Sequence, residues 1–145
     1  MALVSPAAIA YWSALNRHGM TEQLSRTVFI VTDHPVRRPP GEVLDVDYKV
    51  ISLRPQKFFA IRKDWIGKMP FMVTDREKTI IDGLDLPQYS GGVGEVSKAL
   101  STAWTQLNES KLRQYAAKIG NSAVAKRLGF LMETLGEMTA KPLEK

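Results

Sequence analysis

Short apolar runs, separated by polar and proline-rich breaks, fill the first half of the chain. The segment Thr27–Thr32 is β-branched and apolar, which predicts a buried strand. Looser alternation over Val43–Ser52, an apolar and aromatic run over Phe58–Ile66 and a short run over Met69–Val73 predict further strands. Ahead of them, Ser5-Pro6 combines a hydroxyl N-cap with proline at the first helical position and predicts a helix.

Apolar residues in the second half recur every three or four positions, which is the period of helices. Thr74 or Asp75 caps the first of these helices, and a glycine-containing break at 120–122 separates the last two. Strands and helices do not alternate, so the predicted class is α+β. We expect an N-terminal helix, a small, mainly antiparallel sheet of three to four strands, and a C-terminal bundle of about four helices. Residues 1–145 are expected to form a single domain.

The composition narrows the chemistry of the protein. The chain has 145 residues and no cysteine, which excludes disulfides, cysteine-bound zinc and cysteine nucleophiles. Its two histidines, His18 and His34, do not have a metal-binding spacing, so we expect no metal and no cofactor. No apolar run approaches the roughly 18 residues of a membrane span, and the first residues lack the pattern of a signal peptide. We therefore expect a cytoplasmic protein that does not enter a membrane.

The formal net charge is +5, and the basic excess lies in the middle third of the chain, between Ser25 and Lys78. Such an excess favours an anionic partner such as nucleic acid, although a solvated surface has the same charge. Arg37 and Arg38 stand next to each other in a proline-rich loop, which suits contacts with phosphate. The candidate nucleic-acid-binding residues are Arg37, Arg38, Arg54, Lys57, Arg62 and Lys63. We interpret the aromatic residues among them as core residues.

Three residues in the strand region suggest an enzymatic alternative. Asp33 follows the first predicted strand, and Asp47 and Lys49 lie on the second. Restriction-type nucleases use this arrangement, in which two carboxylates hold a magnesium ion and the lysine stabilises the attacking water. The triplet is also common by chance, since charged strand residues usually point to solvent. A magnesium-dependent nuclease therefore stays as the alternative function.

Three stretches of the chain together resemble one protein family. They are Tyr11–Gln23 leading into Arg26–Thr32, then Asp75–Leu84 followed by Pro87–Gly92 and Glu95-Val96, and finally Lys126–Glu133. In this order they are similar to the AbiEi-type antitoxins, which are transcriptional regulators of type IV toxin–antitoxin and abortive-infection systems, a form of antiviral defence. The three stretches are spread over nearly the whole length of the chain, from Tyr11 to Glu133.

The resemblance implies the carboxyl-terminal effector domain of such an antitoxin. That domain is non-catalytic and counteracts a nucleotidyltransferase-like toxin; whether it touches the toxin directly stays open at this point. Family members usually carry an amino-terminal winged helix that binds operator DNA, and we expect the present chain to lack it. We also expect the basic surface to assist DNA binding. A third possible function is that of a domain that only forms a homodimer, through the last amphipathic helix.

Overall fold

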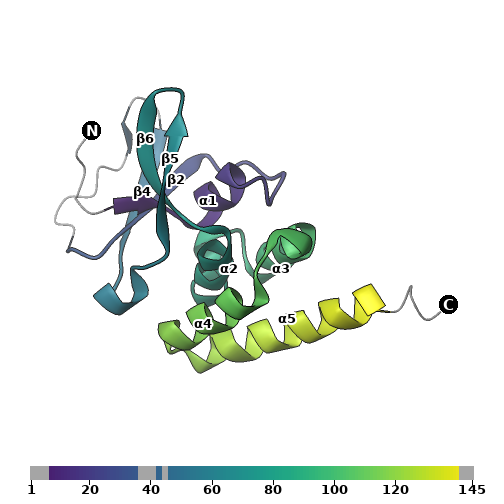
Figure 1. Cartoon of the computed structure of the whole chain (residues 1–145). Coiled ribbons are helices and arrows are strands. Elements are labelled where there is room, and N and C mark those ends of the chain that lie inside the picture. Colours follow the sequence, from purple (N-terminus) through teal and green to yellow (C-terminus); the bar gives the residue numbers. More distant parts are fainter. Residues whose placement is uncertain (1–6, 36–41, 44–45, 141–145) are drawn as a thin grey trace.

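Strands occupy the first half of the chain and helices the second, apart from one short helix near the start (Figure 1). The computed structural model describes residues 7–35, 42–43 and 46–140. The strands are β1 (Ala7–Ile9), β2 (Thr27–Thr32), β3 (Glu42–Val43), β4 (Val46–Ser52), β5 (Ile61–Ile66) and β6 (Met69–Thr74). The helices are α1 (Tyr11–Arg17), α2 (Arg76–Asp85), α3 (Val93–Ala103), α4 (Glu109–Ile119) and α5 (Ser122–Ala140).

The six strands form one mixed sheet with the order β3-β4-β2-β1-β6-β5. The neighbours β2–β4 and β1–β6 are parallel, and the other three pairs are antiparallel. The class is α+β, but the prediction of a small, mainly antiparallel sheet of three to four strands is wrong. The three residues of β1 and the two of β3 are too few to leave a periodic signal in the sequence. The spacing of strands along the chain also does not determine which of them pair.

The predicted N-terminal helix is wrong as well, because the chain enters the sheet first. Ser5 and Pro6 lie outside the described residues, and the next three residues form β1 between β2 and β6. The backbone N–H of Ala10 still donates to the carbonyl of Phe29 at 3.0 Å, and α1 begins only at Tyr11. Pairing with two neighbouring strands therefore outweighs the local helix signal.

The third predicted strand starts later than expected. A 3₁₀ turn spans Pro55–Lys57, and Ala60 has a φ of 57°, so the extended run begins at Ile61. The two phenylalanines ahead of it leave the sheet register and enter different cores. Phe58 packs against the cluster over the sheet, and Phe59 packs against the helical cluster.

Helix α2 lies at the centre of the helical half and contacts each of the other helices (Figure 1). Eight of its ten residues are buried. The cluster around it takes buried side chains from all five helices, as well as Met20. The apolar stripe of α5 belongs to this cluster through Val124, Leu128, Met132 and Leu135. We expected a homodimer to form through this apolar stripe, but the stripe is buried against the other helices of the same chain.

Three residues of the stretches that resemble the antitoxin family, Asp75, Glu77 and Arg127, form hydrogen bonds with backbone groups near helix ends. Asp75 is the N-cap of α2, as predicted, and its Oδ1 accepts the backbone N–H of Lys78 at 2.7 Å. The carboxylate of Glu77 accepts the backbone N–H of Asn108 at 2.9 Å, immediately before α4. The guanidinium of Arg127 donates to the carbonyl of Leu84 at 2.8 Å, near the end of α2. These side chains stabilise the fold, because each bonds to a backbone N–H or C=O group near a helix end, where the helix itself supplies no partner.

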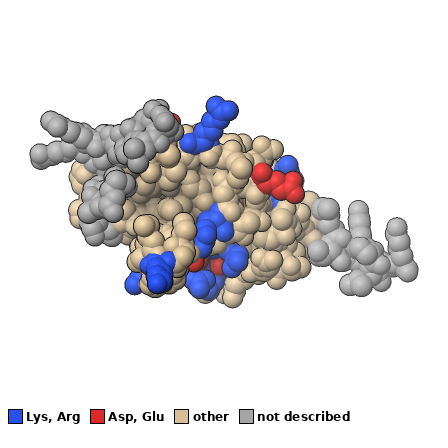
Figure 2. Space-filling model, turned by 90° about the horizontal axis from the view of Figure 1, so that it is seen from above, with Lys and Arg blue, Asp and Glu red and all other residues tan. Residues whose placement is uncertain are grey.

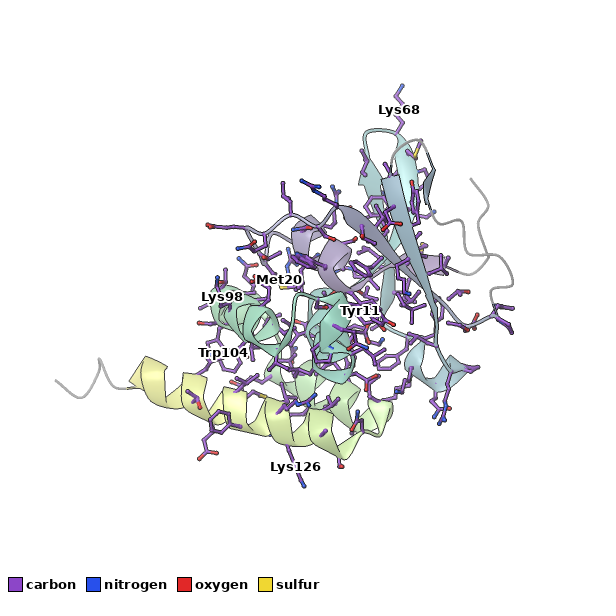
Figure 3. The ribbon with its side chains drawn as sticks, turned by 180° about the vertical axis from the view of Figure 1, so that it is seen from behind. Tyr11, Met20, Lys68, Lys98, Trp104 and Lys126 are labelled. Carbon is purple, nitrogen blue, oxygen red and sulfur yellow. The ribbon has the colours of Figure 1, made fainter. Side chains whose placement is uncertain are left out.

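Replacing Arg127 by alanine should lower the free energy of unfolding by about 1–2 kcal/mol, since it removes a charged donor from a helix-end carbonyl. Lys126 is the matched control: it is exposed and extends from α5 into solvent (Figure 3). The Lys126→Ala variant should stay within about 0.5 kcal/mol of the parent protein. Urea denaturation followed by circular dichroism measures both values. Equal effects of the two substitutions would show that the Arg127 hydrogen bond does not stabilise the fold.

Candidate recognition surface

Strands β5 and β6 form a hairpin that projects beyond the rest of the sheet (Figure 1). All six residues of each strand are paired with the other, and a two-residue turn at Gly67 and Lys68 joins them. Gly67 has a φ of 60°, which suits a glycine at the first position of such a turn. On its other side β6 pairs with β1 at Val73, close to its end. In the sheet, the outer part of the hairpin is therefore held by its own ladder alone, since β1 reaches β6 only at Val73.

Large apolar side chains are exposed along this projecting part. Trp65 is 50% exposed, Ile66 61%, Met69 70% and Met72 38%. Among the described residues, four of the seven large hydrophobic side chains that are exposed belong to this hairpin. Exposed apolar surface concentrated in one place usually marks an interaction site. We call the exposed residues of this hairpin the hairpin patch: Lys63, Trp65 and Met72 lie on one face, Ile66 and Met69 on the other, and Lys68 at the turn.

The hairpin patch carries two lysines, and the one carboxylate beside it, Asp64 on the same face as Ile66 and Met69, is paired with Arg17. Lys68 extends outward from the tip (Figure 3). The ammonium group of Lys63 lies 5.5 Å from the centre of the Trp65 ring, so the lysine covers one side of the indole. The patch therefore combines an apolar centre with two cations.

Arg17 of α1 fixes the hairpin against the body of the molecule. Its guanidinium donates to Asp64 Oδ2 at 2.8 Å and to the carbonyl of Trp65 at 2.7 Å, and it lies 5.1 Å from the ring centre of Phe71. The hydrogen bond from Arg17 lowers the pKa of Asp64 to about 2, so this carboxylate stays ionised. Arg17 thus binds the only acidic side chain of β5 and covers part of its open edge. Such covering protects an edge strand from pairing with another chain.

The predicted nucleic-acid-binding residues do not form one surface. Arg37 and Arg38 lie outside the described residues, and Arg54 is exposed just after β4. Lys57 forms an ion pair with Asp85 at 3.0 Å, which neutralises it. Arg62 and Lys63 are neighbours on β5, so their side chains point to opposite faces of the sheet.

The space-filling view agrees with this separation. Figure 2 shows basic side chains in several separate groups, with uncharged surface between them and acidic side chains beside some of them. A continuous basic groove is not visible on that face. The basic excess of the sequence is therefore dispersed over the part of the surface seen there.

The three residues of the nuclease alternative are not brought together. β2 and β4 are parallel, with Thr27 opposite Asp47, whereas Asp33 follows the last residue of β2. Six residues along a strand correspond to roughly 20 Å. Asp33 and Asp47 therefore lie at opposite ends of the ladder, and one magnesium ion cannot bind both. Among the described residues, no group of three or more His, Asp or Glu side chains is placed to hold a metal ion.

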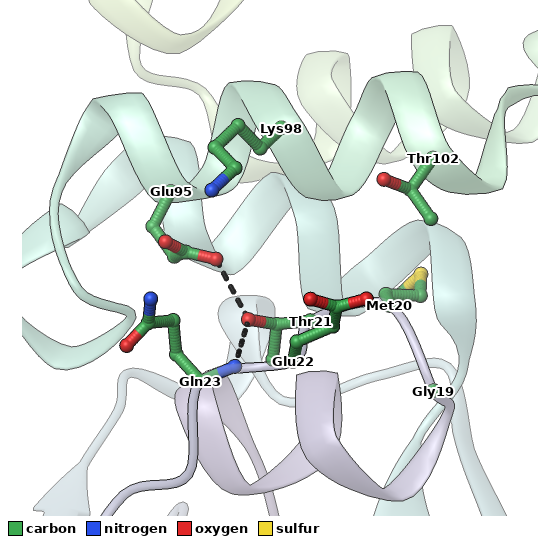
Figure 4. Close-up of a pocket in the computed structure, with 8 residues that line it drawn as sticks. All are labelled: Gly19, Met20, Thr21, Glu22, Gln23, Glu95, Lys98 and Thr102. Atoms are coloured by element: carbon green, nitrogen blue, oxygen red, sulfur yellow. Dashed lines mark hydrogen bonds between the residues drawn. The ribbon is translucent and has the colours of Figure 1, made fainter.

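A groove of about 310 Å³ lies between α3 and the segment that follows α1 (Figure 4). The hydroxyl of Thr21 donates to Glu95 at 2.7 Å and accepts the backbone N–H of Gln23 at 3.1 Å. Lys98 and Thr102 line the other side from α3. The hydrogen bond between Thr21 and Glu95 therefore attaches the 19–23 segment to α3.

Sequence reasoning missed the hairpin patch, because the interpretation of the aromatic residues as core is wrong for Trp65. The available signal was weak: Trp65, Ile66 and Met69 surround a glycine-containing turn, which predicts a hairpin but not its exposure. Neither a scan against models of protein families nor a search of curated proteins finds a significant match to this chain. None of the helices in the described residues has the length and apolar character needed to cross a membrane.

Proposed function

We propose that this chain is a non-catalytic recognition domain of the antitoxin type, which counteracts a nucleotidyltransferase-like toxin. The observation that carries the proposal is the hairpin patch, a projecting surface of exposed apolar and basic side chains. A surface of this kind is costly to leave in water unless a partner covers it.

The distribution of the family-like residues supports the same proposal. The residues of the stretch Asp75–Leu84 are almost all buried, and they build the helix around which the other helices pack. Asp75, Glu77 and Arg127 each bond to a backbone group at a helix end. Their similarity to the antitoxins is thus a similarity of scaffold, and function on such a scaffold lies on exposed segments.

The nuclease alternative receives less support. Its mechanism requires both carboxylates at one metal ion, and the parallel ladder separates Asp33 from Asp47. Arg54, Arg62 and Lys63 remain exposed and suit a weak, non-specific contribution to DNA binding.

The proposal is tested by sequencing the genes beside this one and, where one encodes a nucleotidyltransferase-like protein, by co-expressing it with this chain. We expect the toxin alone to arrest growth and the co-expressed pair to grow normally. An Asp47→Ala variant of this chain should rescue growth equally well, because the proposal gives that carboxylate no catalytic part. Continued arrest in the presence of the well-folded chain would overturn the proposal. Duplex-DNA binding that weakens steeply with salt, without rescue, would favour a DNA-binding role instead.

A further inference from the structure

We infer that one face of the β5–β6 hairpin binds single-stranded nucleic acid, with the Trp65 ring stacked on an unpaired base and lysines bound to the neighbouring phosphates. The inference goes beyond the proposed function, because it names a separate ligand and requires no contact with the toxin. We call this surface the Trp65 face; it consists of Lys63, Trp65, Pro70 and Met72, and Lys68 extends from the adjoining turn (Figure 3).

The antiparallel register of the hairpin places these side chains together. Lys63 lies opposite Met72 in the ladder. Trp65 lies opposite Pro70, and residues two apart on a strand point to the same side of the sheet. Trp65 is 50% exposed and Met72 38%, and the other two residues are exposed as well. The Trp65 face is therefore a small, open surface that carries an aromatic ring.

The Trp65 face has two cations and no carboxylate. The ammonium group of Lys63 lies 5.5 Å from the centre of the Trp65 ring, and Lys68 follows at the turn. Asp64 points to the opposite face, where it is bonded to Arg17 at 2.8 Å. Neither lysine forms an ion pair with an acidic side chain of the described residues. Both ammonium groups are therefore available to phosphate.

Proteins that bind single strands combine exposed aromatic rings with basic side chains. Unpaired bases stack on the rings, and the basic side chains follow the phosphates. In a duplex the bases are stacked on one another and present only their edges in the grooves. A single indole beside two lysines offers few hydrogen bonds to base edges. The Trp65 face therefore fits an unpaired strand better than a duplex.

A protein partner is the main alternative occupant of this face. Its apolar part is limited to Trp65, Pro70 and Met72, because the exposed Ile66 and Met69 point to the opposite side of the hairpin. A stable protein interface buries about 800 Å² on each partner, which is much more than three side chains supply. A base, by contrast, needs only one ring to stack on. The size of the face therefore favours a nucleic acid.

Lys63 changes partner when the nucleic acid binds. In the free protein its ammonium group is attracted by the indole, and such an attraction is weak at an exposed site. A phosphate carries a full negative charge, and the flexible stem of lysine lets the ammonium group move to it. The side of the ring that the lysine leaves becomes open to a base.

The hairpin is supported from the side that does not bind the nucleic acid. Arg17 donates to Asp64 Oδ2 at 2.8 Å and lies 5.1 Å from the ring centre of Phe71, and both of these side chains point away from the Trp65 face. Arg17 also donates to the carbonyl of Trp65 at 2.7 Å. Arg17 is therefore a positioning residue, since it fixes the hairpin and leaves the Trp65 face open.

The test measures the binding of labelled oligonucleotides to the purified chain by fluorescence anisotropy. The probes are oligouridylate, oligothymidylate and a DNA duplex, each roughly ten nucleotides long, which is within the usual site size of single-strand-binding domains. The variants are Trp65→Ala, Trp65→Phe and Lys63→Ala. Ile66→Ser is the matched control, because Ile66 is 61% exposed next to Trp65 but points to the opposite face. All substituted side chains are exposed, so thermal melts should stay close to that of the parent protein.

We expect the parent chain to bind the single strands more tightly than the duplex. Trp65→Ala should bind them about tenfold more weakly, Trp65→Phe should keep part of the affinity, and Ile66→Ser should bind like the parent protein. Lys63→Ala should also bind more weakly and show a smaller salt dependence, since one phosphate contact is lost. Binding should quench the tryptophan fluorescence of the parent protein but not of Trp65→Phe, because Trp12 and Trp104 pack against the two hydrophobic clusters.

Tighter binding of either single strand than of the duplex supports the inference, and a preference between the two strands identifies RNA or DNA as the source of the base. No binding of single strands at low salt, equal affinities of the parent and Trp65→Ala, or equal losses in Trp65→Ala and Ile66→Ser would each overturn it. Sedimentation with phosphatidylserine-containing vesicles that requires Trp65, without binding of oligonucleotides, would assign the face to a lipid surface and also overturn it. Rescue of growth is measured separately, so the inference can fail while the proposed function stands, and the reverse also holds.

Discussion

Replacing Asp82 by asparagine is expected to lower the free energy of unfolding by about 3–5 kcal/mol. Asp82 Oδ1 lies 2.6 Å from the ammonium group of Lys78, and the two side chains are only 3% and 1% exposed. The asparagine removes the negative charge and leaves the buried ammonium of Lys78 without compensation. The ring of Phe59, whose centre is 4.7 Å from that ammonium, replaces only part of the attraction. Urea denaturation of the two proteins measures the difference.

The double variant Lys78→Met, Asp82→Leu distinguishes the loss of one charge of the buried pair from the loss of both. Removing both charges together also removes the desolvation cost of burying them, so this variant should be more stable than Asp82→Asn. Equal losses in the single and the double variant would show that packing, not charge, explains the effect. A loss below about 1 kcal/mol for Asp82→Asn would show that the pair is not buried as described.

The pH dependence of the same variants has a defined sign. Burial raises the pKa of Asp82 to about 6, although the neighbouring Lys78 acts in the opposite direction. Between about pH 6 and pH 4 the folded chain holds a proton that the unfolded chain has already released. Proton uptake by Asp82 therefore adds stability as the pH falls through this range and adds none above it, where only the ionised pair with Lys78 distinguishes the parent protein from Asp82→Asn. The stability advantage of the parent protein over Asp82→Asn should increase from pH 7 to pH 4.

Local signals predicted the elements of the helical half well. The N-cap at Asp75 and the break after α4 are both as predicted, because capping residues and glycine act within a few positions. The left-handed C-cap at Gly120, with a φ of 75°, is such a signal. The burial of Lys78 and Asp82, in contrast, could not be predicted from local signals. Their spacing of four residues is typical of an exposed helix surface, and only the packing around α2 buries them.

The sheet was predicted less well, because its arrangement depends on contacts between distant segments. Thr27–Thr32 is a strand as expected, but nothing local indicates that it pairs in parallel with β4 and antiparallel with β1. The exposure of Trp65 could not be predicted for a related reason. A strand residue is buried or exposed according to what covers its face, and β6 meets β1 at Val73, away from the hairpin tip.

Replacing Gly83 by valine is expected to lower the free energy of unfolding by about 3 kcal/mol. A Cβ atom at this position of α2 would lie 2.7 Å from Val96 Cγ2 and 3.3 Å from Ser90 Oγ. Val96 and Ser90 are themselves fully buried, so neither can move aside without disturbing the core. The close approach of α2 to α3 therefore requires a residue without a side chain at position 83. Thermal and urea unfolding measure the loss.

Gly129 provides a control of the same residue type within another helix. It is exposed in α5, and no other side chain lies within 4 Å of its Cβ position, so Gly129→Val should change stability by less than about 0.5 kcal/mol. Adding Val96→Ala to Gly83→Val should cost less than the sum of the two single substitutions, because the smaller side chain makes room for the new one. Strict additivity, or equal losses at positions 83 and 129, would mean that the contact between Gly83 and Val96 does not set the distance between α2 and α3. The loss of stability in Gly83→Val would then have to come from the helix propensity of valine, which is the same in α2 and α5.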